Sequence, residues 1–247
     1  MSASGNGDTV ASLRARLART ERDASARQHQ LERYAADLRE VFKQERARAQ
    51  ELRESYKATV RALSNAVEAR DAYTGKHAER VTAYGIALAH ATGLDTDHRP
   101  GIEFGFLLHD VGKVAVPDAV LFKKSALSDD EFSLIAQHPV IGSEILRDVD
   151  FLGEGKLVVR YHHERWDGRG YPDRLSRDEI PLPARVFAVA DALDALTTDR
   201  PYRRAAGFEF AREEIRSSAG THFDPTVVAA YDTISDETFA ELRDGVA

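Results

Sequence analysis

The sequence predicts an all-α protein, a helical bundle preceded by a long N-terminal helix. Three observations support this prediction. Apolar residues recur at steps of three and four, which is the period of an amphipathic helix. Glycine and proline are confined to the joints between these segments. No stretch shows the alternation of a half-buried strand, and no internal repeat is evident.

The long helix is predicted over residues 10–66. Its apolar or small residues recur mostly at alternating steps of four and three, which is the heptad pattern of a coiled coil. A helix from Val10 to Leu63 would be about 80 Å long at 1.5 Å per residue. Such a helix is too polar to be stable alone, so we expect it to pair in parallel with a second copy; the alternative is packing against its own chain. The heptad residues are Leu17, Ala24, Leu31, Ala35, Leu38, Phe42, Ala49, Leu52, Tyr56 and Leu63.

Residues 1–9 are expected to be disordered and are too short to form a preceding domain. They lack the basic and apolar regions of a signal peptide, and no apolar run reaches the length of about 18–20 residues needed to cross a membrane. The absence of cysteine excludes disulfides and thiolate ligands, which fits a reducing compartment. These observations predict a cytoplasmic protein without a membrane span.

The net charge of −7 is unevenly distributed. Between Val10 and Val60 there are 12 Lys and Arg against 8 Asp and Glu, or +4, so the rest of the chain carries −11. An acidic body binds nucleic acid polymers poorly, and we expect no such partner. A local group of cations still suits a small dianion, because distant charges are screened beyond about 8–10 Å.

The predicted body, residues 67–247, contains an imidazole and a carboxylate side by side. His109 and Asp110 follow an apolar segment, so both side chains are expected to point inward from a helix end. An unpaired charge would be costly there, and a cation should therefore meet the pair. Imidazole together with carboxylate suits Mn, Fe, Zn or Ni better than the all-oxygen shells of Ca or Mg.

Further donors lie at the ends or inner faces of other apolar segments. Four are histidines, one of which precedes Pro139, where the helix is expected to kink or restart. The fifth is an aspartate inside a nearly apolar segment, where it would be an unpaired buried acid unless a metal or arginine met it. The five donors are His77, His138, His162, His163 and Asp191.

Seven donors exceed the needs of one ion that keeps open positions. Two ions bridged by Asp110 are the economical arrangement, and two metals about 3.5–4 Å apart are the usual device for in-line displacement at phosphorus. The sequence therefore predicts phosphoester hydrolysis. The remaining histidines, His29, His90, His98 and His222, are interpreted as ordinary surface or packing residues.

Three strings resemble the HD-GYP subgroup of HD-domain phosphohydrolases. They are His109-Asp110-Val111-Gly112-Lys113, the string from His162 to Gly170-Tyr171-Pro172, and the run from Asp191 to Arg203. The resemblance extends over roughly Val67 to Tyr231. It implies an all-helical HD domain that hydrolyses cyclic di-GMP to the linear dinucleotide pGpG or to GMP, with two divalent ions, Fe or Mn.

The resemblance also implies a role for each matching residue. Asp110 bridges the ions and Lys113 faces the scissile phosphate, where an ammonium stabilises developing charge. Arg200 and Arg203 match the positions that hold the substrate phosphates, and some relatives have Lys in place of the second. The first ion would be held by His77, His109, Asp110 and Asp191, the second by Asp110, His138 and His162, with His163 completing or flanking the second site.

A departure from the pattern bears on the number of ions. Trinuclear relatives have a glutamate four residues before the first histidine, and Tyr73 stands there in this chain. A phenol is a poor substitute for a carboxylate with these ions, which favours two metals.

The role of one loop and the activity of the chain both remain open at this point. The loop from Arg165 to Pro172 resembles an element for substrate access and partner contact, or else Trp166 and Tyr171 simply pin it to the helices. The chain is expected to be the phosphodiesterase described above. The alternative from another class is a non-catalytic dimeric adaptor, which would bind a cyclic dinucleotide or a diguanylate cyclase partner. A different HD-domain reaction is a further alternative. It would be hydrolysis of another nucleotide or, as in the distant inositol-oxygenase-like branch, oxygen chemistry at a di-iron centre, which the Gly170-Tyr171-Pro172 string disfavours.

Overall fold

The computed structural model describes residues 5–70, 76–199 and 204–246, and it confirms the all-α prediction. Within these ranges the regular structure is helical and no strand is formed. The chain divides into two units, residues 1–56 and residues 57–247. Helix α1 (Gly5–Glu68) contributes to both units. All the residues of the candidate site that the structure describes belong to the second unit.

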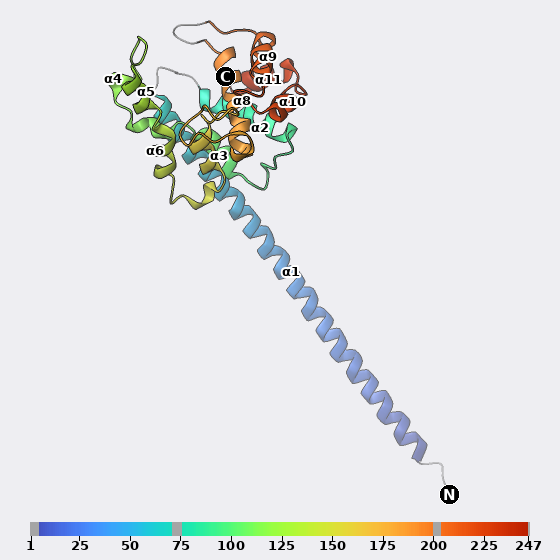
Figure 1. Ribbon diagram of the computed structural model, residues 1–247. Coiled ribbons are helices and arrows are strands. Elements are labelled where there is room, and N and C mark those ends of the chain that lie inside the picture. Colours follow the sequence, from blue (N-terminus) through green and yellow to red (C-terminus); the bar gives the residue numbers. More distant parts are fainter. Residues whose placement is uncertain (1–4, 71–75, 200–203, 247) are drawn as a thin grey trace. The chain divides into compact units, whose positions relative to one another are not determined.

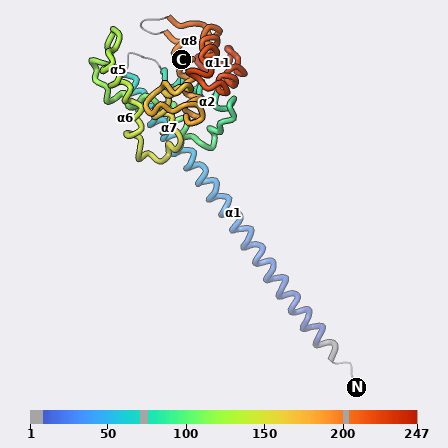
Figure 2. Tube along the Cα trace, viewed as in Figure 1, coloured from blue at the N-terminus to red at the C-terminus, as the bar shows by residue number. Residues whose placement is uncertain are grey.

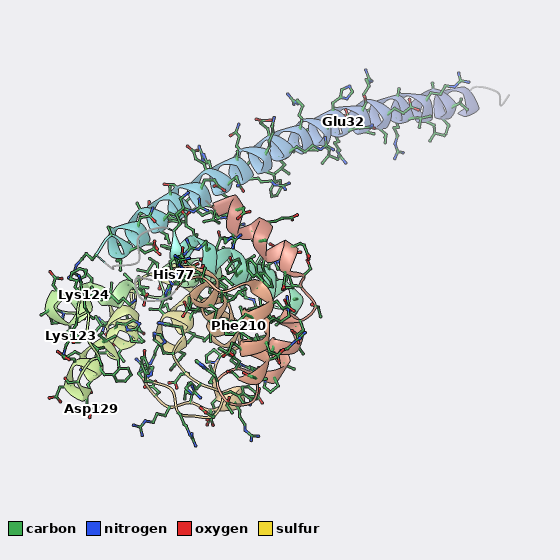
Figure 3. The ribbon with its side chains drawn as sticks, turned by 90° about the horizontal axis from the view of Figure 1, so that it is seen from above. Glu32, His77, Lys123, Lys124, Asp129 and Phe210 are labelled. Atoms are coloured by element: carbon green, nitrogen blue, oxygen red, sulfur yellow. The ribbon has the colours of Figure 1, made fainter. Side chains whose placement is uncertain are left out.

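The described part of the first unit is helical. The helix begins at Gly5, ahead of the predicted start at Val10, so residues 5–9 are helical and not disordered as expected. Its heptad side chains are largely exposed, with Leu31 66% and Phe42 72% accessible. Figure 3 shows side chains of this part, Glu32 among them, standing outward from the helix on all sides. Over the described residues, no helix is both long and apolar enough to cross a membrane.

The core of the second unit is built around α2 and α8, which pack against each other at the centre of the bundle (Figure 1). α2 also packs on α3, and α3 packs on α7. The large buried side chains Tyr84, Phe106 and Phe187 belong to this core. α9, α10 and α11 complete it on the red side of the tube in Figure 2. The bounds are α2 (His77–Ala91), α3 (Gly101–Leu107), α7 (Gly155–Tyr161), α8 (Leu182–Thr197), α9 (Phe208–Ser217), α10 (Pro225–Tyr231) and α11 (Asp236–Val246).

A second apolar cluster joins the last turns of α1 to the rest of the unit. Val60 is buried in it together with Leu107 and Val159. Ser64 Oγ donates a hydrogen bond to the carbonyl oxygen of Leu107 at 2.8 Å. Because Val60 and Ser64 contact the other helices of the second unit, the C-terminal turns of α1 pack as part of that unit.

Local sequence signals explain several helix starts. Asp224 caps α10 by accepting from the backbone N–H of Thr226, and Pro225 occupies the first turn. A capping box at Ser128 begins α5 (Asp129–Ile135). The predicted restart at Pro139 is confirmed, because α6 (His138–Ile145) begins after α5 with this proline in its first turn. The short elements are η1 (Val111–Ala115), α4 (Asp118–Leu121), η2 (Asp150–Leu152) and η3 (Arg177–Glu179).

The approach of η1 to α6 is so close that Gly112 has no room for a side chain. A Cβ atom at this position would overlap the carbonyl oxygen of His138 and lie 2.6 Å from the backbone nitrogen of Gly142. We therefore expect Gly112→Ala to lower the free energy of unfolding by about 3 kcal/mol, because backbone cannot move away as a flexible side chain would. Urea denaturation measures this loss.

The control is Gly207→Ala, since a Cβ atom at Gly207 would meet nothing within 4 Å. This variant should unfold within about 0.5 kcal/mol of the parent protein. Equal stability of the two variants would show that η1 and α6 are not held in this contact.

Candidate metal centre

The seven predicted donors lie together in two groups. Within each group the candidate ligand atoms are all within 4.8 Å of one another. The first group comes from α2, the segment between α3 and η1, and α8. The second comes from the residue before η1, the start of α6 and the two residues after α7. Figure 3 places His77 inside the helical unit. The first group is His77, His109 and Asp191, and the second is Asp110, His138, His162 and His163.

Asp110 lies between the two groups. Its Oδ2 is 3.1 Å from Nε2 of His109, and its Oδ1 is 3.2 Å from Nε2 of His138. Burial would raise the pKa of this carboxyl, but His109, Lys113 and His138 outweigh burial and hold the pKa well below its usual range. The carboxylate is therefore charged at neutral pH and offers one oxygen to each group.

Three imidazoles are oriented by backbone carbonyls. In each ring Nδ1 lies within hydrogen-bond distance of a carbonyl oxygen one turn earlier. A proton on Nδ1 satisfies that contact and leaves the Nε2 lone pair directed at the centre, which is the tautomer that binds metal. The pairs are His109 with Phe106 (3.0 Å), His138 with Ile135 (2.8 Å) and His162 with Val159 (3.0 Å).

The contact between His138 and His162 tests whether these residues fit a metal ion. Their Nε2 atoms face each other at 3.2 Å, although the Nδ1 atoms of both rings already face carbonyls. Burial and the neighbouring His163 and His138 hold the pKa of His162 well below its usual range, so a proton between the rings is disfavoured. Burial and His138 likewise lower the pKa of His163 to about 3. Two inward lone pairs beside a carboxylate fit a divalent cation.

His77 is oriented by a carboxylate that the sequence had not singled out. Its Nδ1 lies 2.7 Å from Oδ2 of Asp194, while its Nε2 lies 3.5 Å from Oδ1 of Asp191. Arg80 donates to both oxygens of Asp194, at 2.7 and 3.1 Å. Burial opposes protonation of His77, but the Asp194 hydrogen bond and the charges of Asp191 and Asp194 raise its pKa. A carboxylate behind a metal-facing imidazole increases the basicity of the ligand.

The expectation that Asp191 is a buried acid is wrong. Its side chain is 31% exposed, whereas Asp194 is 2% exposed and takes the place of the buried, paired acid. Positions three apart on α8 share a face, so both carboxylates meet His77. This spacing, with Arg80 three residues after His77, is the signal from which Asp194 could have been found.

The predicted phosphate-binding residues are only partly described. Lys113 Nζ lies 2.7 Å from Oδ2 of Asp110, so the ammonium is placed at the centre of the cluster. Arg200, Arg203 and Tyr73 lie outside the described residues.

The loop that follows the two histidines is not helical, as predicted. The buried carboxylate of Glu164 accepts from the backbone N–H of Asp173 at 2.7 Å. The backbone N–H of Trp166 donates to the carbonyl oxygen of His222 at 3.0 Å. The Tyr171 ring packs on His163 with 4.7 Å between centroids. These contacts hold the loop beside the cluster.

Two pockets flank the cluster. The loop pocket, about 780 Å³, lies between α5 and the loop, and Phe132, Tyr171 and three arginines are among its lining residues. The α8–α9 pocket, about 410 Å³, is lined by residues of α8, α9 and the segment after α9. His163 and His222 line both pockets. The interpretation of His222 as an ordinary residue misses this position, because only the folded chain brings it beside His163.

Comparisons with known proteins identify the family and support the fold. The family model described as the HD domain matches residues 61–227. The chain is 42% identical over 180 residues to 3'3'-cGAMP-specific phosphodiesterase 2 of Vibrio cholerae, covering 72% of this chain and 34% of that protein. It is 40% identical to the cyclic di-GMP phosphodiesterase response regulator RpfG of Xanthomonas campestris, covering 73% of this chain and 48% of RpfG. The chain belongs to the HD-domain family and, within it, to the HD-GYP subgroup.

Solved structures share the fold. V-cGAP3, a cyclic GMP-AMP specific phosphodiesterase of V. cholerae, matches with a TM-score of 0.60 at 18% identity, covering 75% of this chain and 50% of that one. The HDG"Y"P protein Bd1817 of Bdellovibrio bacteriovorus matches with a TM-score of 0.54 at 22% identity, covering 73% and 63% of the two chains. The chain spans a third to a half of the length of the curated relatives named above.

Proposed function

We propose that this chain is a metal-dependent phosphodiesterase that hydrolyses cyclic di-GMP to the linear dinucleotide pGpG, or onward to GMP. The observation that carries the proposal is the arrangement of seven donors in two groups with Asp110 between them. A binuclear centre of Fe or Mn fits this set, because imidazole and carboxylate together suit those ions. The activities for which the relatives are named supply the substrate class.

The chain's own residues account for metal retention and charge stabilisation. Two bound ions would polarise the phosphate and activate water. The carbonyl contacts of His109, His138 and His162 hold these rings in the metal-facing tautomer. Lys113 supplies a fixed positive charge beside Asp110, where it would stabilise charge developing on the phosphate oxygens. We further propose that Arg200 and Arg203 hold the substrate phosphates.

Product analysis tests the proposal. Protein purified without oxygen and assayed for metal is incubated with cyclic di-GMP, and the products are separated by chromatography. Linear pGpG or GMP, formed with about two metals per chain, is the expected result. An absence of turnover by protein with a filled site would exclude this substrate, and a site that cannot be loaded would favour the adaptor alternative.

Lys113→Ala is expected to lower kcat by about 10²- to 10³-fold while metal content stays unchanged. The charged Lys113 ammonium contacts the Asp110 carboxylate but has no lone pair with which to bind a metal ion. Its removal should therefore leave the metal ligands in place. Steady-state kinetics and metal analysis of the same preparation provide the measurement. Lys123→Ala is the matched control, because Lys123 forms an ion pair with Glu131 instead. Loss of metal from the Lys113 variant would make this lysine structural.

We also propose that α1 pairs in parallel with the α1 of a second copy. The exposed heptad side chains of the first unit, including Leu31 and Phe42, support this proposal. Analytical ultracentrifugation should give the mass of a dimer, and replacement of Leu31 and Phe42 by Glu should give the monomer. A monomeric parent protein at micromolar concentration would reject the coiled coil.

A further inference from the structure

We infer that the α8–α9 pocket binds a guanine base of the substrate and that Glu214 is the residue that recognises it. This inference rests on the proposed function, since it assigns a base site to a cyclic dinucleotide whose phosphate lies at the metal centre. Nothing in the donor set itself distinguishes guanine from adenine. A site that reads the base must therefore lie outside the donor set.

The position of the α8–α9 pocket fits the base next to the scissile phosphate. His162, His163 and Asp191 line the pocket and also belong to the candidate metal centre. A phosphate held at that centre would place its attached nucleoside at the mouth of the pocket. The remaining space, about 410 Å³, is large enough for a purine.

The walls of the pocket suit a flat aromatic ring. On the α8 side the lining residues include Ala188, Ala192 and Ala195, whose short side chains leave room between the helices. His222 and Phe223 also line the pocket, and their rings stack with centroids 4.4 Å apart and an interplanar angle of 8°. Planar bases stack on such rings.

The acidic group that remains for recognition is the Glu214 carboxylate. Glu214 lies on α9, and Ser218, four residues later, is the C-cap residue of this helix, so the two occupy the same face of it. Over the described residues the Glu214 side chain makes no hydrogen bond or ion pair. Asp191, the other acid of the pocket, belongs to the metal group. Glu214 is thus available to a ligand.

The chemistry of a carboxylate selects guanine. Ionised Glu has only acceptors, and the Watson–Crick edge of guanine presents two adjacent donors, N1–H and the exocyclic amino group. Adenine presents an acceptor at N1 beside its amino donor, so a carboxylate would face a lone pair. Glutamine has one donor and one acceptor and would suit adenine better than glutamate does.

The test compares Glu214→Gln with the parent protein on cyclic di-GMP and cyclic di-AMP. The ratio of kcat/KM for the two substrates should fall by at least about tenfold, because guanine loses a bidentate contact and adenine gains one. Glu213→Gln is the matched control, since Glu213 is exposed and does not line the pocket. Metal content should be the same in all three proteins.

Equilibrium binding of the same two dinucleotides separates this inference from the proposed function. A shift in binding preference without turnover by any protein would keep Glu214 as the guanine-recognising residue and reject the hydrolase. Turnover with an unchanged preference in the Glu214 variant would overturn the inference alone. A preference lost equally in the Glu213 variant would also overturn it, because overall charge would then be the cause.

The isomer of the product gives a second readout. The 3'3'-linked cyclic GMP-AMP contains one guanine, so a guanine-selective pocket would present only one of its two phosphodiester bonds to the metal centre. The parent protein should therefore form one linear isomer, whereas Glu214→Gln should form both. Equal amounts of the two isomers from the parent protein would count against a base site in this pocket.

Discussion

Asp110→Asn is expected to remove both the metal ions and the activity. The substitution keeps the size of the side chain but removes the negative charge and one oxygen acceptor. Because the two carboxylate oxygens face His109 and His138 in different groups, both ions should be affected. We expect metal content to fall from about two ions per chain to less than one, and kcat to fall by at least about 10³-fold. Metal analysis and product chromatography of one preparation measure both effects.

The matched control is Asp97→Asn, since Asp97 is exposed and lies outside the donor groups. It should retain full metal content and full turnover. If Asp110→Asn kept one ion and lost the other, the carboxylate would belong to a single group. Full turnover by this variant would reject Asp110 as the bridge.

Asp194→Asn is expected to weaken metal binding without removing a ligand. The Asp194 carboxylate accepts from Arg80 and faces Nδ1 of His77, so the amide would break one of these contacts. We expect a 10- to 100-fold loss of metal affinity, the usual effect of removing a carboxylate behind a ligating histidine. Loss of a buried ion pair should also lower the free energy of unfolding by about 3 kcal/mol.

Two measurements separate positioning from stability in this variant. Metal affinity is determined at a temperature at which circular dichroism shows the protein folded. An NMR titration of the metal-free protein should show a lower pKa for His77, because Asp194 raises that pKa in the parent protein. Asp178→Asn, which alters the exposed partner of an ion pair with Arg185, should change neither quantity. An unchanged His77 pKa in the folded but less stable variant would make Asp194 purely structural.

The sequence predicted the helices and the donors because both leave local signals. Apolar periodicity and the cap at Asp224 are properties of neighbouring residues, so the helical class and the start of α10 follow from them. The seven donors could be chosen because imidazole and carboxylate are uncommon inside apolar segments. Their proximity was inferred from chemistry, and the structure does bring them within two groups.

The partners of those donors depend on the tertiary structure. The carbonyl contacts of His109, His138 and His162 come from the turn before each residue, but only packing brings the three rings to one point. Asp191 and Asp194 differ by three positions on one helix, and sequence alone does not reveal which of them is buried.

The sequence by itself determined the all-α class of the fold and the metal-binding chemistry of the site. Helical periodicity and the residue types that bind metal can both be recognised within one segment of the chain. The tertiary structure decided which acid supports His77, that His222 lies beside His163, and that Glu214 lines a pocket next to the metal centre. Most of these contacts are between residues that are far apart in the sequence. They could not be predicted from it, because the burial and orientation of a side chain depend on which helices pack together, and no local pattern encodes that pairing.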